Sequence, residues 1–204
     1  MDSSSLKSWR KAQRERLIAE RLAIPDATLE AWRERMDGFL ERSFPGLAGR
    51  RVAFCWPIKK EYDARHYART LRERGSLTAL PVVVAPRSPL AFREWHPGVR
   101  LAKGALDIPY PVDSAQIVPE AVLLPMNGWD PQGYRLGYGA GFFDRTLAAE
   151  AMHRAGVTAA QPDAVTPAGR HAAITSASRG RSPPDRAAQR YAPANDASVK
   201  IPRK

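Results

Sequence analysis

The stretch of the chain with the most chemical information covers residues 127–145 and reads NGWDPQGYRLGYGAGFFDR. It follows an apolar run and leads into a segment with helical character, and four glycines fall within nine residues: Gly133, Gly137, Gly139 and Gly141. Glycine allows the backbone N–H groups of a loop to approach a ligand closely. Because a strand followed by a glycine loop and a helix start is a geometry that cradles phosphate, the stretch indicates a phosphate-binding loop.

Two charged residues of the same stretch suit the same ligand. Arg135 offers a planar fork of donors for phosphate oxygens, and Asp144 could coordinate a magnesium ion that the phosphates carry. A structural interpretation stands beside this one, because a glycine-rich turn followed by a capping Asp has the same residue types. The stretch matches neither the GxxxxGK[ST] pattern nor the usual placement of the dinucleotide-binding pattern, so residue types alone favour the structural interpretation.

Other reactive residue types give weaker signals. Cys55 lies in an apolar run, which predicts a buried structural thiol rather than a nucleophile. The four His residues share no metal-ligand spacing with carboxylates, so a zinc site is not expected. Glu61 and Asp63 lie at the N-terminal end of an expected helix, where carboxylates complement the helix dipole. Phe142 and Phe143 open a further expected helix, so at least one of them should belong to the core.

Alternating helical and extended patterns surround these residues. Apolar spacing and capping residues predict helices and strands, with Asp26 as the N-cap of the second helix and Gly75 as the stop of the third. This alternation predicts an α/β fold, a three-layer sandwich around a mainly parallel, Rossmann-like sheet that binds ligands beyond the carboxyl ends of its strands. The expected helices cover residues 5–22, 27–43, 63–75 and 142–149, and the expected strands cover residues 51–56, 77–84, 90–95 and 121–126.

The chain contains two kinds of sequence. All 16 Leu, all six Phe and all five Trp precede residue 150. Residues 151–204 have 14 Ala, six Pro and nine Lys or Arg against three Asp. Such a segment buries too little apolar area to offset the entropy lost on ordering. We therefore expect a domain over residues 1–150 and a basic, disordered tail over residues 151–204.

Composition also bounds the class of protein. The net charge of +11 over 204 residues suits a ligand with phosphates or carboxylates but does not require nucleic acid. No apolar run is long enough to cross a membrane, and the N-terminus lacks the apolar stretch of a secretory signal. The single Cys excludes a disulfide framework and favours a reducing, cytoplasmic setting. The alternative from another class is a non-catalytic protein that binds nucleic acid through its basic tail. That tail has one aromatic residue, Tyr191, and no RNA-binding pattern, so specific nucleic-acid recognition is not expected.

The glycine stretch closely resembles the signature of the 5-formyltetrahydrofolate cyclo-ligase (5,10-methenyltetrahydrofolate synthetase) family. In that family, a strand ending in Pro leads to a run of the form D-x-x-G-x-R-L-G-x-G-x-G-[YF]-[YF]-D-R. Eleven positions match it in order, namely Asp130, Gly133, Arg135, Leu136, Gly137, Gly139, Gly141, Phe142, Phe143, Asp144 and Arg145.

The resemblance extends upstream of this run. The first segment, SWRKAQRER, is similar to the family's basic ATP-binding helix, with Arg10 in the place of its arginine. Leu6 occupies the position of a lysine of the family's helix, so the adjacent Lys7 is the candidate for the role of that lysine. The segment WPIKKEYD is similar to the family's folate loop, with Glu61 as the substrate glutamate and Trp56 lining the pocket. A later match, G-x-x-x-I-P-x-P, has Tyr110 where the family usually has Glu, so the role of that acid is not carried over.

The resemblance implies ATP-dependent cyclisation of 5-formyltetrahydrofolate to 5,10-methenyltetrahydrofolate, with release of ADP and phosphate, by a cytoplasmic, monomeric ligase that uses Mg²⁺. It implies Arg135 as the catalytic residue, Glu61 and Trp56 as folate contacts and Asp144 as the metal ligand. The implied ATP contacts are Lys7, Arg10, Arg135, Leu136, Gly137, Tyr138, Gly139, Ala140, Gly141, Phe142 and Phe143.

The C-terminal segment departs from the family. The resemblance is expected to stop near residue 150, because nothing in AMHRAGVTAAQPDAVTPAGRH reproduces the family's further metal-site motif. The Ala-, Arg- and Pro-rich composition is typical of GC-rich coding DNA read out of frame. We therefore expect a divergent or frameshifted C-terminus, a fold that is incomplete there, and weak activity. An inactive paralogue that still binds nucleotide is a further alternative.

Overall fold

The computed structural model describes residues 3–130, 133–149, 157–159 and 172–177, and its centre is a six-stranded sheet with the order β3-β2-β1-β6-β10-β9. The three central strands β2, β1 and β6 are parallel, whereas β3, β10 and β9 are added antiparallel. The strands are β1 (Arg51–Ala53), β2 (Leu77–Val82), β3 (Ala91–Trp95), β6 (Ala121–Pro125), β9 (Val157–Ala159) and β10 (Ala172–Ala177).

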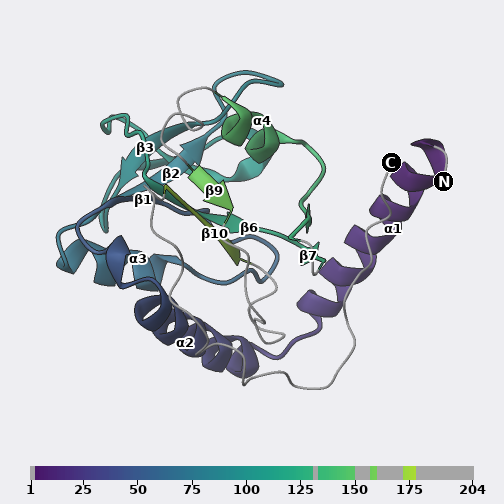
Figure 1. The fold of residues 1–204 in the computed structure, drawn as a ribbon, viewed down its shortest axis with the longest axis horizontal. Coiled ribbons are helices and arrows are strands. Elements are labelled where there is room, and N and C mark those ends of the chain that lie inside the picture. Colours follow the sequence, from purple (N-terminus) through teal and green to yellow (C-terminus); the bar gives the residue numbers. More distant parts are fainter. Residues whose placement is uncertain (1–2, 131–132, 150–156, 160–171, 178–204) are drawn as a thin grey trace.

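Helices cover both faces of this sheet. The helices α2 (Asp26–Ser43) and α3 (Arg65–Glu73) lie on one side, and α4 (Phe142–Ala148) lies on the other (Figure 1). The first helix, α1 (Ser3–Leu22), extends past the end of the sheet beside β7 (Figure 1). The remaining elements are the short helices η1 (Pro45–Leu47) and η2 (Ala105–Asp107) and two hairpins, formed by β4 (Leu101–Lys103) with β5 (Pro109–Pro111) and by β7 (Gly128–Trp129) with β8 (Arg135–Leu136).

Two apolar clusters hold the three layers together. Successive residues of a strand point to opposite faces, so each buried strand supplies both clusters. On the side of α2 and α3, strand residues such as Leu80 and Leu123 pack with helix residues such as Leu71. On the side of α4, Ala79 and Leu124 belong to the second cluster, against which the partly buried Phe143 and Leu147 pack. Burial on both faces explains why the central strands appear in the sequence as continuous apolar runs.

The predicted fold class is confirmed, and most predicted elements appear within a few residues of their expected bounds. The parallel arrangement holds for the three central strands, and the first strand is shorter than its apolar run. The expected N-cap is wrong: Pro25 is the N-cap residue of α2, and Asp26 begins the helix, with its carboxylate 2.8 Å from Nζ of Lys60. The two hairpins were not predicted, because strands of two or three residues show no recognisable alternation.

The sheet also uses residues from the C-terminal segment. Strand β10 pairs antiparallel with β6, placing Ala172 opposite Pro125 and Ser176 opposite Ala121. The expectation of a disordered tail is therefore wrong for β9 and β10. The other residues after 149, and with them the expected disordered tail and its boundary, lie outside the described residues and stay predictions.

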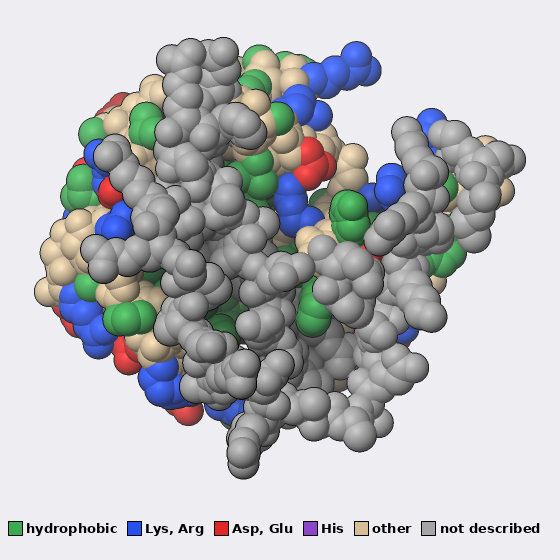
Figure 2. Space-filling model, in the orientation of Figure 1, with side chains coloured by type: hydrophobic (Ala, Val, Ile, Leu, Met, Phe, Trp, Pro, Cys, Tyr) green, Lys and Arg blue, Asp and Glu red, His purple; other side chains and the backbone are tan. Residues whose placement is uncertain are grey.

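The surface carries mixed charge. On the part of the face in Figure 2 that is not drawn in grey, basic and acidic side chains are interspersed and do not form one continuous basic stripe. Among the helices described here, none combines the length and the apolar character needed to cross a membrane.

The core makes a direct stability prediction. Leu80 is completely buried, whereas Leu77, in the same strand, is 42% exposed. We expect Leu80→Ala to lower the free energy of unfolding by about 2–5 kcal/mol, because a cavity remains where the side chain was. Leu77→Ala should lower it by about 1 kcal/mol or less, since less apolar area is lost. Urea unfolding of both variants tests this, and equal losses would contradict the placement of the core.

Candidate functional site

The glycine loop begins where β6 ends, at the carboxyl edge of the parallel part of the sheet. After β6, the chain turns into the hairpin of β7 and β8, which is fixed by a bond from the Asn127 N–H to the Leu136 carbonyl (2.8 Å). Asp130, which is 2% exposed, closes the far end of this hairpin, since its Oδ1 accepts a hydrogen bond from the Tyr134 N–H at 2.9 Å. The matched residues of the family run therefore form a folded hairpin, loop and helix start.

Two glycines of this loop are required by the backbone. Gly139 has a φ of +99°, and Gly141, the N-cap of α4, has a φ of +67°, both in the region that disfavours side chains. A Cβ at Gly139 would also lie 3.1 Å from Cζ of Arg14. In contrast, a Cβ at Gly137 would meet no described atom within 4 Å. The absence of a side chain at Gly137 is therefore not explained by packing within the described chain.

Helix α1 contacts the loop through a residue that the sequence analysis missed. Nε of Arg14 donates to the carbonyl of Gly137 at 2.7 Å. Desolvation, with a smaller contribution from the positive charge of Arg10, lowers the pKa of Arg14. Arg10 is half-buried one turn earlier, and Lys7 is exposed. The spacing of Arg10, Arg14 and Arg21 along one helix face was the signal that could have identified this contact.

The two charged residues of the loop are paired with each other. Arg135 donates to the Asp144 carboxylate, and the Arg135 side chain is 19% exposed, while that of Asp144 is 75% exposed. The guanidinium of Arg145 donates to the carbonyl of Ala140 at 2.8 Å and lies 5.1 Å from the centre of the Phe142 ring. Among the described residues, no group of three or more His, Cys, Asp or Glu is arranged to hold a metal ion.

The predicted folate glutamate lies in a strained loop after β1. Lys59 and Lys60 both have positive φ, 48° and 59°, which costs free energy for residues other than Gly. The carboxylate of Glu61 accepts a hydrogen bond from the Ile58 N–H at 3.0 Å and another from the Tyr138 hydroxyl at 2.7 Å. Burial raises the pKa of Glu61, and these two hydrogen bonds oppose that shift only in part.

Glu61 and Asp63 were expected to complement the dipole of a helix, and this interpretation holds only for Asp63. Helix α3 begins at Arg65, so Glu61 lies outside it. Asp63 does accept from the backbone N–H of Arg65 at 3.1 Å and from its guanidinium at 2.7 Å. Burial alone would raise the pKa of Asp63, but the bonds from Arg65 outweigh burial and lower it. The same guanidinium lies 4.5 Å from the centre of the Trp56 ring, the predicted lining residue of the folate pocket.

A second missed residue, Arg21, joins the two loops. Arg21 is 2% exposed; its Nε donates to the Lys59 carbonyl and its Nη2 donates to the Tyr138 hydroxyl, each at 2.7 Å. The side chain of Tyr138 therefore lies between a buried guanidinium and the carboxylate of Glu61. Three segments that are distant in the sequence, α1, the loop after β1 and the glycine loop, meet at this tyrosine.

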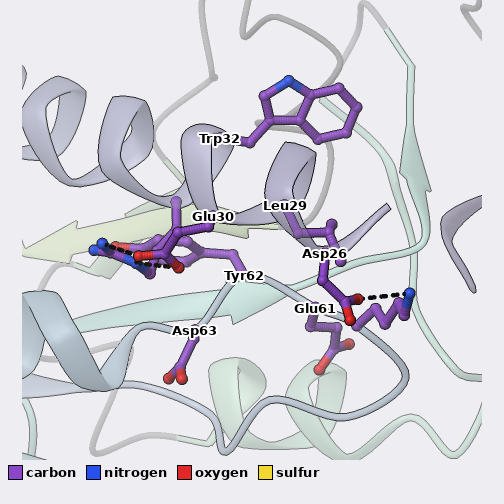
Figure 3. Close-up of a pocket in the computed structure, with 9 residues that line it drawn as sticks. Asp26, Leu29, Glu30, Trp32, Glu61, Tyr62 and Asp63 are labelled. Atoms are coloured by element: carbon purple, nitrogen blue, oxygen red, sulfur yellow. Dashed lines mark hydrogen bonds and ion pairs between the residues drawn. The ribbon is translucent and has the colours of Figure 1, made fainter. Parts of the chain in front are cut away.

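A cavity of about 120 Å³ opens beside Glu61, between the start of α2 and the loop that bears it (Figure 3). Lys60 bridges its rim, with Nζ 2.8 Å from the Asp26 carboxylate and 2.9 Å from the Ile24 carbonyl. The lining residues are Asp26, Leu29, Glu30, Trp32, Arg33, Lys60, Glu61, Tyr62 and Asp63.

A third missed residue is Asn127, which directly follows the last residue of the apolar run 121–126. It is 1% exposed, and neither its Oδ1 nor its Nδ2 has a hydrogen-bond partner within the described chain. Buried amides are nearly always paired, so an unpaired one at the edge of a candidate site indicates a place where water or ligand completes the bonding. Cys55 is partly exposed rather than buried as expected, and desolvation, with a smaller contribution from the charge of Glu61, raises the pKa of its thiol.

Comparisons with known proteins decide the family. The model of the family described as "5-formyltetrahydrofolate cyclo-ligase family" matches residues 6–174. The chain belongs to this family. A relative from Mycolicibacterium smegmatis named 5-formyltetrahydrofolate cyclo-ligase is 34% identical over 151 residues, which cover 70% of this chain and 74% of the relative. A relative of the same name from Escherichia coli K12 is 32% identical over 110 residues, which cover 50% of this chain and 60% of the relative.

Solved structures support the same fold. The NMR structure of Aquifex aeolicus 5,10-methenyltetrahydrofolate synthetase has a TM-score of 0.60 and 23% identity, over 68% of this chain and 72% of the other. The structure of a 5,10-methenyltetrahydrofolate synthetase from Mycoplasma pneumoniae has a TM-score of 0.52 and 19% identity, over 68% of this chain and 77% of the other.

Membership of the cyclo-ligase family, a family of ligases, is thereby confirmed as the glycine run had predicted. The expected end of the resemblance is wrong, because the family match continues through β9 and into β10. The individual roles assigned to residues stay predictions. The geometry brings Arg135, Asp144, Tyr138 and Glu61 around one loop, and it adds Arg14, Arg21 and Asn127 to the candidate site.

Partly buried Glu61 makes the stability of this cyclo-ligase family member depend on pH. Its raised pKa means that the folded chain keeps the Glu61 proton to a higher pH than the unfolded chain does. The stabilisation linked to this proton is complete below the unfolded pKa and is lost as pH rises through the folded pKa. We expect the free energy of unfolding of the wild type, relative to that of Glu61→Gln, to fall as pH rises from about 4 to about 7. Urea titrations across this interval measure the difference, and a difference that rises with pH would contradict the burial of this carboxylate.

Proposed function

We propose that the chain cyclises 5-formyltetrahydrofolate to 5,10-methenyltetrahydrofolate with ATP, releasing ADP and phosphate. The observation that carries this proposal is the hydrogen bond of 2.7 Å between Tyr138 of the glycine loop and Glu61 of the loop after β1. It brings a phosphate-type loop and the predicted folate acid into one site, as a reaction between ATP and a folate requires.

The chemistry explains why both ligands must lie together. A formamide carbon is a poor electrophile, and its oxygen is a poor leaving group. When the formyl oxygen takes the terminal phosphoryl group of ATP, ADP departs and the oxygen becomes part of a phosphate leaving group. N10 of the folate then forms a bond to the formyl carbon and loses its proton, and phosphate departs. Such a transfer depends mainly on positioning and on neutralisation of charge.

The glycine loop supplies the phosphate side of the site in this proposal. The open space at Gly137 allows a phosphate to approach the backbone, and Arg135 would place its guanidinium on the transferring group as the catalytic cation. Arg10 and Lys7 of α1 add positive charge, and Arg14 holds the carbonyl of Gly137 out of the phosphate path. The surrounding loop positions, Leu136, Tyr138, Gly139, Ala140, Gly141, Phe142 and Phe143, would line the nucleotide.

Asp144 fits a magnesium ion that arrives with the nucleotide. Mg²⁺ is usually held by one or two carboxylates together with substrate phosphates, and Asp144 is an exposed carboxylate at the glycine loop. The described residues offer no preformed cluster of ligands, so the phosphates would have to supply the rest. Bound there, the ion would neutralise phosphate charge, while Asp144 would exchange its pairing with Arg135 for the metal and free that guanidinium.

The folate side of the proposed site is built around Glu61. Its carboxylate retains accepting capacity beyond its bonds to Ile58 and Tyr138, which suits the N–H groups of a pterin ring. The ring of Trp56 offers apolar contact area for the same ligand, and the cavity beside Glu61, which Trp56 does not line, offers more. The raised pKa of Glu61 shows that its charge is poorly solvated, so a ligand that donates hydrogen bonds to it would bind favourably.

The glycine loop gives a test of nucleotide binding. Gly137→Ala should weaken ATP binding by at least about tenfold without changing the free energy of unfolding, because the added methyl group meets only the ligand. Gly139→Ala should lower both the affinity for ATP and the free energy of unfolding, since the positive φ of Gly139 and the neighbouring Arg14 oppose a side chain. Calorimetric titration with ATP and urea unfolding measure the two effects. Unchanged ATP affinity in a folded Gly137→Ala chain would remove the phosphate-binding interpretation.

The folate loop gives an independent test. Glu61→Gln should weaken binding of 5-formyltetrahydrofolate by about 10- to 100-fold and binding of ATP far less, because the lost charge faces the folate. The matched control is Glu120→Gln, at the opposite end of β6, where the carboxylate accepts from the Arg51 N–H at 3.0 Å. Fluorescence titration with each ligand provides the affinities, and equal losses for both ligands in Glu61→Gln would refute this assignment.

A further inference from the structure

We propose that Tyr138, held by the buried Arg21, couples the two ligand sites, so that nucleotide bound at the glycine loop tightens folate binding and folate tightens nucleotide binding. Arg21 acts as a positioning residue in this device. The proposal rests on the function proposed above and adds a regulatory link between its two halves.

Tyr138 occupies a constrained position in the glycine loop. It stands between Gly137, whose carbonyl is fixed by Arg14, and Gly139, whose φ of +99° fixes the turn. Any shift of the loop backbone around a phosphate therefore moves the Cα of Tyr138. Its hydroxyl is at the same time bonded to the folate acid at 2.7 Å. A movement at one ligand is thus transmitted to the other through a single rigid side chain.

Arg21 constrains the glycine loop and the loop after β1 together. Its guanidinium donates to the Lys59 carbonyl and to the Tyr138 hydroxyl at 2.7 Å each, in the fixed fork geometry of arginine. The Lys59 carbonyl belongs to the strained turn in which Lys59 and Lys60 have positive φ. Strained turns persist only where neighbouring groups hold them, and a buried guanidinium can do so. The position of Glu61 therefore depends on Arg21.

Charged side chains surround Tyr138. The Glu61 carboxylate and the Arg21 guanidinium both contact the Tyr138 hydroxyl, and Nζ of Lys59 lies 5.7 Å from the centre of the tyrosine ring. Burial and the nearby Glu61 charge raise the pKa of Tyr138, so the hydroxyl stays protonated and donates to Glu61. The Tyr138 hydroxyl accepts a hydrogen bond from Arg21 while it donates one to Glu61. Hydrogen bonds that form such a chain polarise one another, so each strengthens the other.

Both described hydrogen bonds of the Tyr138 hydroxyl lead to other segments, one to α1 and one to the folate loop. The coupling is therefore assigned to this side chain rather than to the loop backbone.

The test measures how each ligand changes the affinity of the other. The dissociation constant of an ATP analogue with a non-cleavable β,γ bridge is measured with and without saturating 5-formyltetrahydrofolate, and the reciprocal pair is then measured. In the wild type, we expect each ligand to tighten the other by at least about fivefold, by equal factors, as linkage requires. In Tyr138→Phe and in Arg21→Lys, the factor should fall to about twofold or less whatever the affinity of the analogue alone, because the hydrogen bonds that join the two loops are lost.

Matched controls separate coupling from general damage. Tyr134→Phe, at an exposed side chain of the same hairpin, and Arg16→Lys, on the exposed side of α1, should keep the wild-type factor. If Arg21→Lys fails to fold, Tyr138→Phe decides alone. A wild-type factor of one, or an unchanged factor in Tyr138→Phe, would overturn the inference, the latter because direct contact between the bound ligands would then account for the coupling. A wild type that binds only one of the ligands, or neither, would instead reject the proposed function.

Discussion

The hydrogen bond between the Tyr138 hydroxyl and the Glu61 carboxylate joins segments 77 residues apart, and the geometry of the candidate site depends on it. It fixes the glycine loop against the loop after β1 and, through Arg21, against helix α1. Without it, these would be three surface segments at the end of a sheet. With it, the phosphate-type loop and the predicted folate acid face the same space.

This arrangement has an energetic cost that the rest of the fold must offset. Arg21 is almost fully buried, Glu61 is desolvated enough for its pKa to rise, and Lys59 and Lys60 have strained φ values. Burying charged groups destabilises a protein unless they are well hydrogen-bonded, and removing one partner leaves the other uncompensated. The two apolar clusters on either face of the sheet supply the general stability that lets such a site exist. Stability and site geometry are thus provided by different layers of the same fold.

The parallel centre of the sheet determines where the site can form. Strands β1 and β6 run side by side, so the loops that follow them leave the same edge of the sheet. The loop after β1 carries Glu61, and the loop after β6 carries the glycine run. Helix α1 then covers the same edge beside β7 and brings Arg14 and Arg21 to these loops (Figure 1). This agrees with the general placement of ligands beyond the carboxyl ends of parallel strands.

The sequence by itself determined the family, through the spacing of Arg135, three glycines and Asp144, and it determined the α/β class, through alternating helical and apolar runs. It did not reveal that Arg135 pairs with Asp144, that Arg21 is buried, or that β10 pairs with β6. Local patterns reflect contacts within one turn of helix or one strand, so they are readable in a single segment. The partners of Arg21 and Tyr138 lie 38 and 77 residues away, and only the packing of the sheet and α1 brings them together.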